Sequence, residues 1–386
     1  MSNRLRRLRK AISAFAIELP LVVLSPVVPK RRGLWVFLPI FYESQPFNGN
    51  IKYLFGHVVR NHDEIDAYCL GVGERDRRRN RDLAARMCRR RYSPIGILRI
   101  LRAEYLFVDG LTRLSLGSFR VVQLWHGTGF KNIATQTPGA HSFRERIRRG
   151  NAIADFVVAT SEADRQRKEA SFNARRVCVT GSPRNDILVS VTSDGAREIK
   201  RRLGLPGDRR IVGYAPTYRD TGDFVPFSPE AWRRLDVLAA RRGFAFAVKK
   251  HPSETRLRVP DDLEYVRDVS DRVGDVQEFL AVVDLLVSDY SGIVSDFALL
   301  GRPILFFVYD FDRYVRTCRD FYYDLRSILP GPFVSSANEL LAYLESDSWQ
   351  NEGDYQRRLE QFSDLFQSHR DGRSCERVVS ALLAAE

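Results

Sequence analysis

Short apolar segments, turns and helical stretches alternate along this chain, and this order constrains its fold more than any other feature. In the first half, buried strands are predicted at 34–38, 66–70, 105–108, 121–124, 156–159 and 176–180, and a helix at 51–60. Parallel strands need a crossover that usually contains a helix. The alternation is therefore typical of a parallel sheet covered by helices.

A second series of the same kind begins near residue 210. Strands are predicted at 211–215, 244–249, 285–288 and 303–307, and helices at 231–242, 293–300, 338–346 and 355–385. The sequence predicts an α/β protein with two Rossmann-like, doubly wound domains and an interdomain cleft. The expected domains span 31–187 and 188–348, and the helices of 349–386 can cross back to the first. Ligands in such sheets bind at the carboxyl ends of the strands.

The segment 1–30 is predicted to be separate from both domains. A run from Arg4 to Lys10 is basic apart from two leucines, and the apolar stretch that follows is interrupted by Glu18 and prolines. That stretch is too broken for a membrane-spanning helix. Apolar residues at helical spacing, with arginines between them, predict a basic amphipathic helix on an anionic membrane surface. A helix packed on the first domain is the alternative.

The formal net charge of +13 is compatible with nucleic acid, an anionic membrane or phosphate-rich substrates as partners. No nucleic-acid-binding module accompanies the arginine clusters, so no nucleic acid is expected. The five cysteines are scattered and form no CxxC pair, which argues against a disulfide framework and a zinc site. We expect a reducing, cytoplasmic compartment and no bound metal.

Two histidines follow predicted strands. His126 lies in Trp-His-Gly-Thr-Gly directly after the strand 121–124, where a histidine can take a proton from a hydroxyl. His251 follows the strand 244–249 and Lys250, a pattern that suits a phosphate. The alternatives are a buried histidine bound to backbone for His126 and a solvated basic loop for His251.

Three further segments of the second domain carry polar groups at strand ends. Ser291 and Gly292 open the helix after the strand 285–288, where amides and the helix dipole can bind a pyrophosphate. Asp296, in that helix, can orient a ligand hydroxyl. Thr217 and Arg219 follow the strand 211–215 and can contact phosphate. An ordinary capped helix and a simple turn are the alternatives.

In this order the segments resemble the CDP-glycerol glycerophosphotransferase family, which builds wall teichoic acids and some capsular polymers. The motifs that carry the resemblance lie at 47–50, 125–128, 181–186, 214–220, 250–252, 288–291, 296–298 and 319–322. The resemblance implies a GT-B-like fold. It also implies a CDP-polyol donor, CDP-glycerol or CDP-ribitol, with no other cofactor.

The resemblance gives the candidate residues their roles. His126 and His251 become catalytic. The donor contacts are Thr217, Arg219, Lys250, Ser291, Gly292, Asp296 and Arg319, and the acceptor-side residues are Asn48, Gly127 and Thr128. The chain has Gly129 where the family has proline and Gly292 where a second serine is usual. These departures leave the family assignment intact but weaken any statement about the polyol.

The expected reaction transfers glycerol phosphate, or a related polyol phosphate, to a lipid-linked saccharide acceptor and releases CMP. The expected place is the cytoplasmic face of the cell membrane, with peripheral attachment. The chain holds little beyond a transferase core, which favours a primase over a polymerase. The alternatives are a GT-B glycosyltransferase that uses a nucleotide sugar and a non-catalytic, membrane-bound assembly protein.

Overall fold

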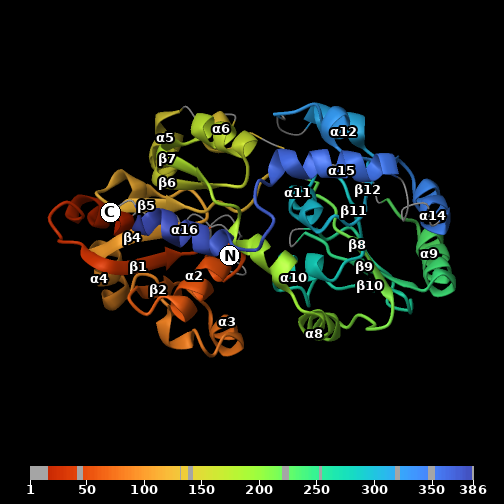
Figure 1. Cartoon of the computed structure of the whole chain (residues 1–386), viewed down its shortest axis with the longest axis horizontal. Coiled ribbons are helices and arrows are strands. Elements are labelled where there is room, and N and C mark those ends of the chain that lie inside the picture. The colour runs from red at the N-terminus through yellow and green to blue at the C-terminus, as the bar shows by residue number, and fades with distance from the viewer. Residues whose placement is uncertain are drawn as a thin grey trace. The chain divides into compact units, whose positions relative to one another are not determined.

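The computed structural model describes residues 16–40, 47–130, 132–137, 142–219, 226–251, 254–317, 322–346 and 353–384 (Figure 1). The chain divides into two compact units. The first contains residues 1–126, 133–184 and 373–386, and the second contains residues 127–132 and 185–372. Each unit is an α/β layer structure around a parallel sheet, as the alternating sequence pattern predicts.

The first unit contains a seven-stranded sheet in the order β3-β2-β1-β4-β5-β6-β7, and all of its strand pairs are parallel. The strands are β1 (Arg31–Leu38), β2 (Asp66–Leu70), β3 (Met87–Cys88), β4 (Ala103–Val108), β5 (Arg120–Gln123), β6 (Ile153–Ala159) and β7 (Asn173–Val179). The order reverses between β1 and β4, which is the switch point of a doubly wound sheet.

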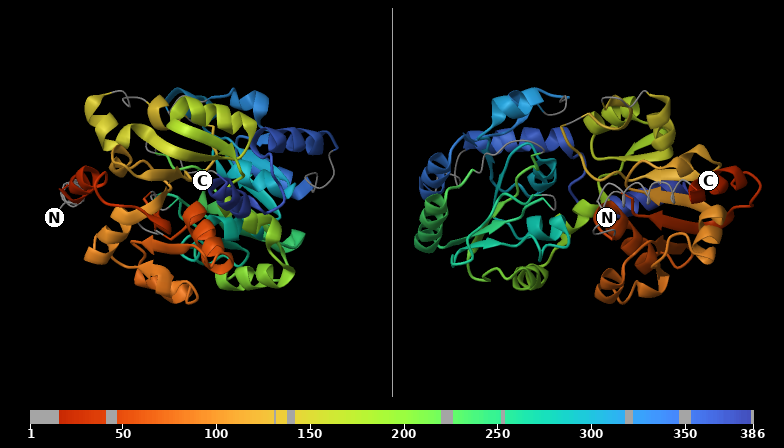
Figure 2. Two further views of the ribbon diagram at one scale, coloured as in Figure 1. Left: turned by 60° about the vertical axis from the view of Figure 1, so that its left-hand side comes forward. Right: turned by 180° about the vertical axis from the view of Figure 1, so that it is seen from behind.

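Helices cover both faces of this sheet. They are residues 16–24, α2 (Gly49–Asn61), α3 (Glu74–Arg79), α4 (Pro94–Arg102), α5 (Phe143–Arg148), α6 (Glu162–Ser171) and α16 (Ser374–Leu383), with 3-10 turns η1 (Ala84–Arg86), η2 (Arg113–Leu116), η3 (Ala134–Gln136) and η4 (Gly150–Ala152). The C-terminal helix α16 packs beside α2, although the two are more than 300 residues apart in the chain (Figures 1 and 2).

The second unit contains a six-stranded parallel sheet in the order β10-β9-β8-β11-β12-β13. Its strands are β8 (Arg210–Tyr214), β9 (Phe244–Val248), β10 (Val266–Asp268), β11 (Leu285–Ser288), β12 (Ile304–Phe307) and β13 (Phe333–Val334). The order reverses between β8 and β11. The carboxyl ends of these two strands therefore form the switch point of this unit.

The helices of the second unit again lie on both faces. They are α7 (Asp186–Ser190), α8 (Ser193–Leu203), α9 (Pro229–Arg242), α10 (Val276–Ala281), α11 (Ile293–Phe297), α12 (Phe311–Thr317), α13 (Leu325–Ile328), α14 (Ala337–Ser346) and α15 (Gly353–Phe366), with 3-10 turns η5 (Pro183–Asn185), which begins in the first unit, and η6 (Ala298–Leu300). Helix α9 shows why they form. Ser228 caps its N-terminus, Pro229 fills the first turn, and Gly243 ends it with φ 70°.

One expectation about the C-terminal end of the chain needs correction. The stretch 355–385, predicted as continuously helical, is broken at residues 367–373 into α15, in the second unit, and α16, in the first. At the other end, the basic part of the predicted amphipathic helix lies outside the described residues. Its continuation, the helix 16–24, buries Leu21 and Glu18 against the first unit. Among the described residues no helix is long and apolar enough to cross a membrane.

Candidate active site

His126 follows β5 by three residues, at the edge of the first sheet where doubly wound folds bind ligands. Its Nδ1 lies 3.0 Å from the carbonyl oxygen of Asp109, the residue after β4. Because a carbonyl oxygen only accepts hydrogen bonds, Nδ1 of the neutral ring carries the hydrogen and Nε2 carries the lone pair. The hydrogen bond thus fixes the tautomer of the ring in which Nε2 can accept a proton, as a general base must.

The charge state of His126 agrees with this role. Burial lowers the pKa of the half-buried imidazole to about 3. The charges of Arg184 and Lys168 act in the same direction, and the hydrogen bond with Asp109 opposes them. The ring is therefore neutral at physiological pH. A pKa this low makes a weak base, and a bound phosphate would raise it by favouring the protonated form.

Asn50 fixes the turn that presents His126, although no role was predicted for it. It lies on the buried face of α2. Its Nδ2 donates to the carbonyls of Leu124 (2.9 Å) and Trp125 (3.0 Å), and its Oδ1 accepts from the hydroxyl of Ser182 (2.8 Å) and the amide of Arg184 (3.0 Å). Trp125 has φ 53°, which is uncommon for a bulky residue. The side-chain amide of Asn50 thus joins the loop after β5 to the loop after β7. These hydrogen bonds also stabilise the positive φ of Trp125, which a tryptophan does not favour by itself.

Asn48 and Arg184 contribute to the same edge. Asn48 is buried and caps α2, with its side-chain oxygen 2.6 Å from the amide of Gly49. The buried Arg184 donates from Nη1 to the carbonyl oxygen of His126 at 2.5 Å. Both residues shape the edge that presents His126. The predicted acceptor contact of Asn48 stays a prediction.

Gly127 and Thr128, expected on the acceptor side, belong to the second unit. The carbonyl oxygen of Thr128 accepts a hydrogen bond from Ser295 of α11 at 2.8 Å, and Phe130 lies in the core of the second unit. A Cβ atom on Gly292 would lie 2.9 Å from this carbonyl oxygen. Glycine at 292, a departure from the family pattern, is thus explained by the close approach of the segment 127–132.

Thr217 and Arg219 form a network at the switch point of the second sheet. The amide and hydroxyl of Thr217 donate to Asp289 at 2.9 and 2.6 Å. Arg219 donates from Nη2 to Asp289 at 2.8 Å and from Nε to Asp310 at 2.7 Å. Although burial opposes its charge, the two carboxylates raise the pKa of Arg219. These contacts give Arg219 the role of fixing the loop after β8, and its predicted contact with the donor phosphate stays a prediction.

Asp296 is also held by other side chains. It is fully buried in α11 and accepts hydrogen bonds from Asn185 (2.9 Å) and Gln277 (3.1 Å). Sequence reasoning gave Gln277 no role, since it lies far from Asp296 along the chain. Ser291 and Gly292 precede this helix, and the hydroxyl of Ser291 is 3.5 Å from the amide of Ile293. The Asp296 cluster thus fixes the position of the helix that begins after the predicted pyrophosphate site.

His251 lies at the carboxyl edge of the second sheet, beyond β9. Its exposed ring stacks on Tyr218 with the ring centroids 5.3 Å apart. Lys250 forms an ion pair with Asp268 at 2.5 Å. Arg319 lies outside the described residues. Among those that are described, no group of three or more histidine, cysteine, aspartate or glutamate side chains could hold a metal ion.

Comparison with protein families supplies a match for nearly the whole chain. Residues 23–384 match the model described as CDP-Glycerol:Poly(glycerophosphate) glycerophosphotransferase. The chain is 25% identical to a teichoic acid poly(glycerol phosphate) polymerase of Bacillus spizizenii over 378 residues, which cover 92% of this chain and 93% of the relative.

A second relative is the teichoic acid ribitol-phosphate polymerase TarL of Staphylococcus aureus, which is 28% identical over 74% of this chain. The chain spans about half of that relative's length, 52%. Among solved structures, the wall teichoic acid polymerase TagF superposes with a TM-score of 0.76 and 22% identity, over 99% of this chain and 97% of that one. At this identity the likeness supports a shared fold.

Proposed function

Because this chain belongs to the CDP-glycerol:poly(glycerophosphate) glycerophosphotransferase family, we propose that it transfers glycerol phosphate from CDP-glycerol to the hydroxyl of a lipid-linked acceptor. The oxygen of the acceptor hydroxyl attacks the β-phosphorus, the bond to the bridging oxygen breaks, and CMP leaves with that oxygen. Such transfer depends mainly on positioning and on stabilisation of charge. Since relatives make both glycerol- and ribitol-phosphate polymers, CDP-ribitol is the second donor to test.

In this proposal the residues divide their work by unit. Nε2 of His126 takes the proton of the attacking hydroxyl. In the second unit, His251 and Lys250 neutralise donor phosphate, and Ser291 with the amides after it binds the pyrophosphate. Arg219 keeps the Thr217 loop in place.

The observation that supports the proposal best is the hydrogen bond between His126 Nδ1 and the carbonyl of Asp109, at 3.0 Å. It directs the lone pair to Nε2, as a general base requires. The experiment compares His126→Ala and His126→Gln with the wild type for CDP-glycerol binding and for transfer. We expect unchanged binding and a loss of turnover of about 10²- to 10⁴-fold. Transfer within about twofold of wild type, which is far smaller than the loss expected for a missing base, would refute the base role.

We also propose attachment to the cytoplasmic face of the membrane through the helix 16–24. Its side chains Leu19, Val23 and Leu24 are exposed, as is Val27, which is 76% exposed. Lys30, Arg31 and Arg32 follow Val27 after two intervening residues, Val28 and Pro29. Apolar residues beside basic ones suit anionic lipid. Replacing Leu19, Val23, Leu24 and Val27 with serine should abolish binding to vesicles that contain phosphatidylglycerol. A variant that still binds would exclude this surface.

The acceptor class and the donor are tested together. Purified protein is incubated with CDP-glycerol, CDP-ribitol or UDP-sugars and a lipid-linked disaccharide, and the product is identified by mass spectrometry. Transfer from a UDP-sugar alone would favour a glycosyltransferase. Transfer of a single unit would favour a primase, and a ladder of products would favour a polymerase.

A further inference from the structure

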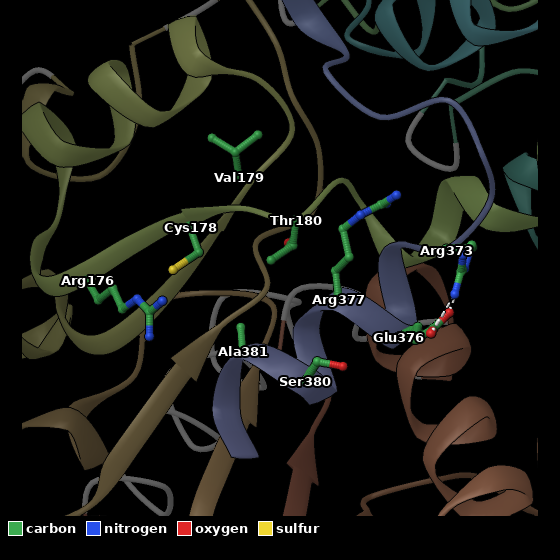
Figure 3. Close-up of a pocket in the computed structure, with 9 residues that line it drawn as sticks. All are labelled: Arg176, Cys178, Val179, Thr180, Arg373, Glu376, Arg377, Ser380 and Ala381. Atoms are coloured by element: carbon green, nitrogen blue, oxygen red, sulfur yellow. Dashed lines mark hydrogen bonds and ion pairs between the residues drawn. The ribbon is translucent and has the colours of Figure 1, made fainter. Parts of the chain in front are cut away.

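An open pocket of about 560 Å³ lies in the first unit, between the edge strand β7 and helix α16 (Figure 3). Arg176, Cys178 and Thr180 line its strand side, and Arg373 and Arg377 line its helix side. The pocket is therefore built from two segments about 200 residues apart in the sequence, and both belong to the same unit.

The charges in this pocket do not cancel. Three guanidinium groups face one carboxylate, Glu376, which leaves a net charge of two positive units. Nε and Nη2 of Arg373 each lie 2.7 Å from a carboxylate oxygen of Glu376, and Figure 3 shows this pair at the side of the pocket away from Arg176. Burial raises the pKa of the Cys178 thiol, so at neutral pH it adds no negative charge. The lining as a whole thus carries an excess of positive charge, to which Arg176, Arg373 and Arg377 all contribute.

The pocket extends from Arg176, in the middle of β7, to the edge of the sheet that carries His126. β5 pairs with β6 and β6 with β7, all in parallel, so the carboxyl ends of β5 and β7 are two strands apart, roughly 10 Å. Thr180 follows β7 directly, and two residues later Ser182 donates to Asn50, which holds the turn before His126. The strand side of the pocket thus continues into the loop that positions the proposed base.

We propose that this pocket binds a phosphodiester group of the acceptor. The inference rests on the proposed function. Transfer of glycerol phosphate to a hydroxyl makes a phosphodiester, so an acceptor that has received one unit carries an anionic group close to its new terminal hydroxyl. Guanidinium groups match phosphate oxygens in geometry and charge. In this arrangement the acceptor hydroxyl lies at His126 and a phosphodiester of the same acceptor chain contacts Arg176 and Arg377.

The test compares the double variant Arg176→Gln/Arg377→Gln with Arg175→Gln. Arg175 is the neighbour of Arg176 in β7, its side chain lies on the opposite face of the strand, and it pairs with Asp155 at 3.5 Å. Transfer from CDP-glycerol is measured to a short glycerol-phosphate oligomer and to a phosphate-free glycerol ether. For the double variant we expect the KM for the oligomer to rise about tenfold or more, with the KM for CDP-glycerol unchanged.

The remaining outcomes each decide a point. Equal KM values for the oligomer in all three proteins would overturn the proposal. A rise in the KM for CDP-glycerol alone would assign the phosphate to the donor nucleotide and also overturn it. If the wild type transfers to neither acceptor, the proposed function fails, and calorimetry with the oligomer then decides the pocket independently. The proposal for the pocket would be supported if Arg175→Gln still binds the oligomer and the double variant does not.

Discussion

Replacing Asn50 with alanine tests whether the turn before His126 depends on one buried amide. The substitution removes four hydrogen bonds, two donated to Leu124 and Trp125 and two accepted from Ser182 and Arg184. Each such bond contributes about 1 kcal/mol, and buried partners left unsatisfied add to the loss. We expect the free energy of unfolding of the first unit to fall by about 3–5 kcal/mol.

Chemical denaturation followed by tryptophan fluorescence measures this loss, with Trp35 and Trp125 as reporters of the first unit and Trp232 as a reporter of the second. Asn61→Ala is the matched control. Asn61 also lies in α2, but it is exposed, and its Nδ2 donates to the carbonyl of His57 at 2.8 Å. The control should lose less than about 0.5 kcal/mol. A loss below about 1 kcal/mol in Asn50→Ala, no more than a single hydrogen bond contributes, would refute the reasoning.

A second measurement separates positioning from simple stability. At a temperature where Asn50→Ala remains folded, we expect kcat for transfer to fall about 10- to 100-fold, since small displacements of a reacting group are costly. The affinity for CDP-glycerol should not change. Wild-type kcat in the folded variant would leave Asn50 with a structural role alone.

Three further outcomes are expected. The pKa of His126 is about 3 in the folded protein and 6.5, the ordinary value, in the unfolded chain, so between these pH values only the unfolded chain binds the proton. The free energy of unfolding should therefore fall by up to about 2 kcal/mol from pH 7 to pH 5 in chemical denaturation. His126→Gln should not show this loss. Arg219→Gln leaves Asp289 and Asp310 without their cation and should cost about 3–5 kcal/mol in thermal unfolding, without rescue by Arg219→Lys. Gly292→Ser restores the family residue but forces a Cβ against Thr128; we expect about 1–3 kcal/mol lower stability by the same assay, and full stability would contradict the packing argument.

Strong apolar runs made much of the fold predictable. The strands 66–70 and 285–288 have the predicted bounds, whereas β3, β10 and β13 were missed, because each is only two or three residues long. The break between α15 and α16 was marked in the sequence by a glycine, Gly372, whose φ of 70° is one that glycine favours. The helical periodicity on either side of it hid that signal.

Residues of the candidate site were predictable only where a chemically reactive side chain directly follows a predicted strand. His126 and His251 follow strands and could be found in this way. The partners that hold His126 and Arg219 in place could not. Asp109 lies 17 residues before His126, and Asp289 and Asp310 lie 70 and 91 residues after Arg219. Such pairs arise from the order of strands in the sheet, which no local pattern encodes.

The composition of the first unit determines when it can be completed during synthesis. Its core includes Val378, Val379 and Leu382 of α16 together with Trp35 and Phe37 of β1. A ribosome adds about 5–20 residues per second and holds the last of them in its exit tunnel. The second unit, contiguous from residue 185 to 372 apart from a six-residue segment made earlier, leaves the ribosome before α16 does. The half that carries His126 therefore acquires its last core residues only after the whole second unit has been synthesised.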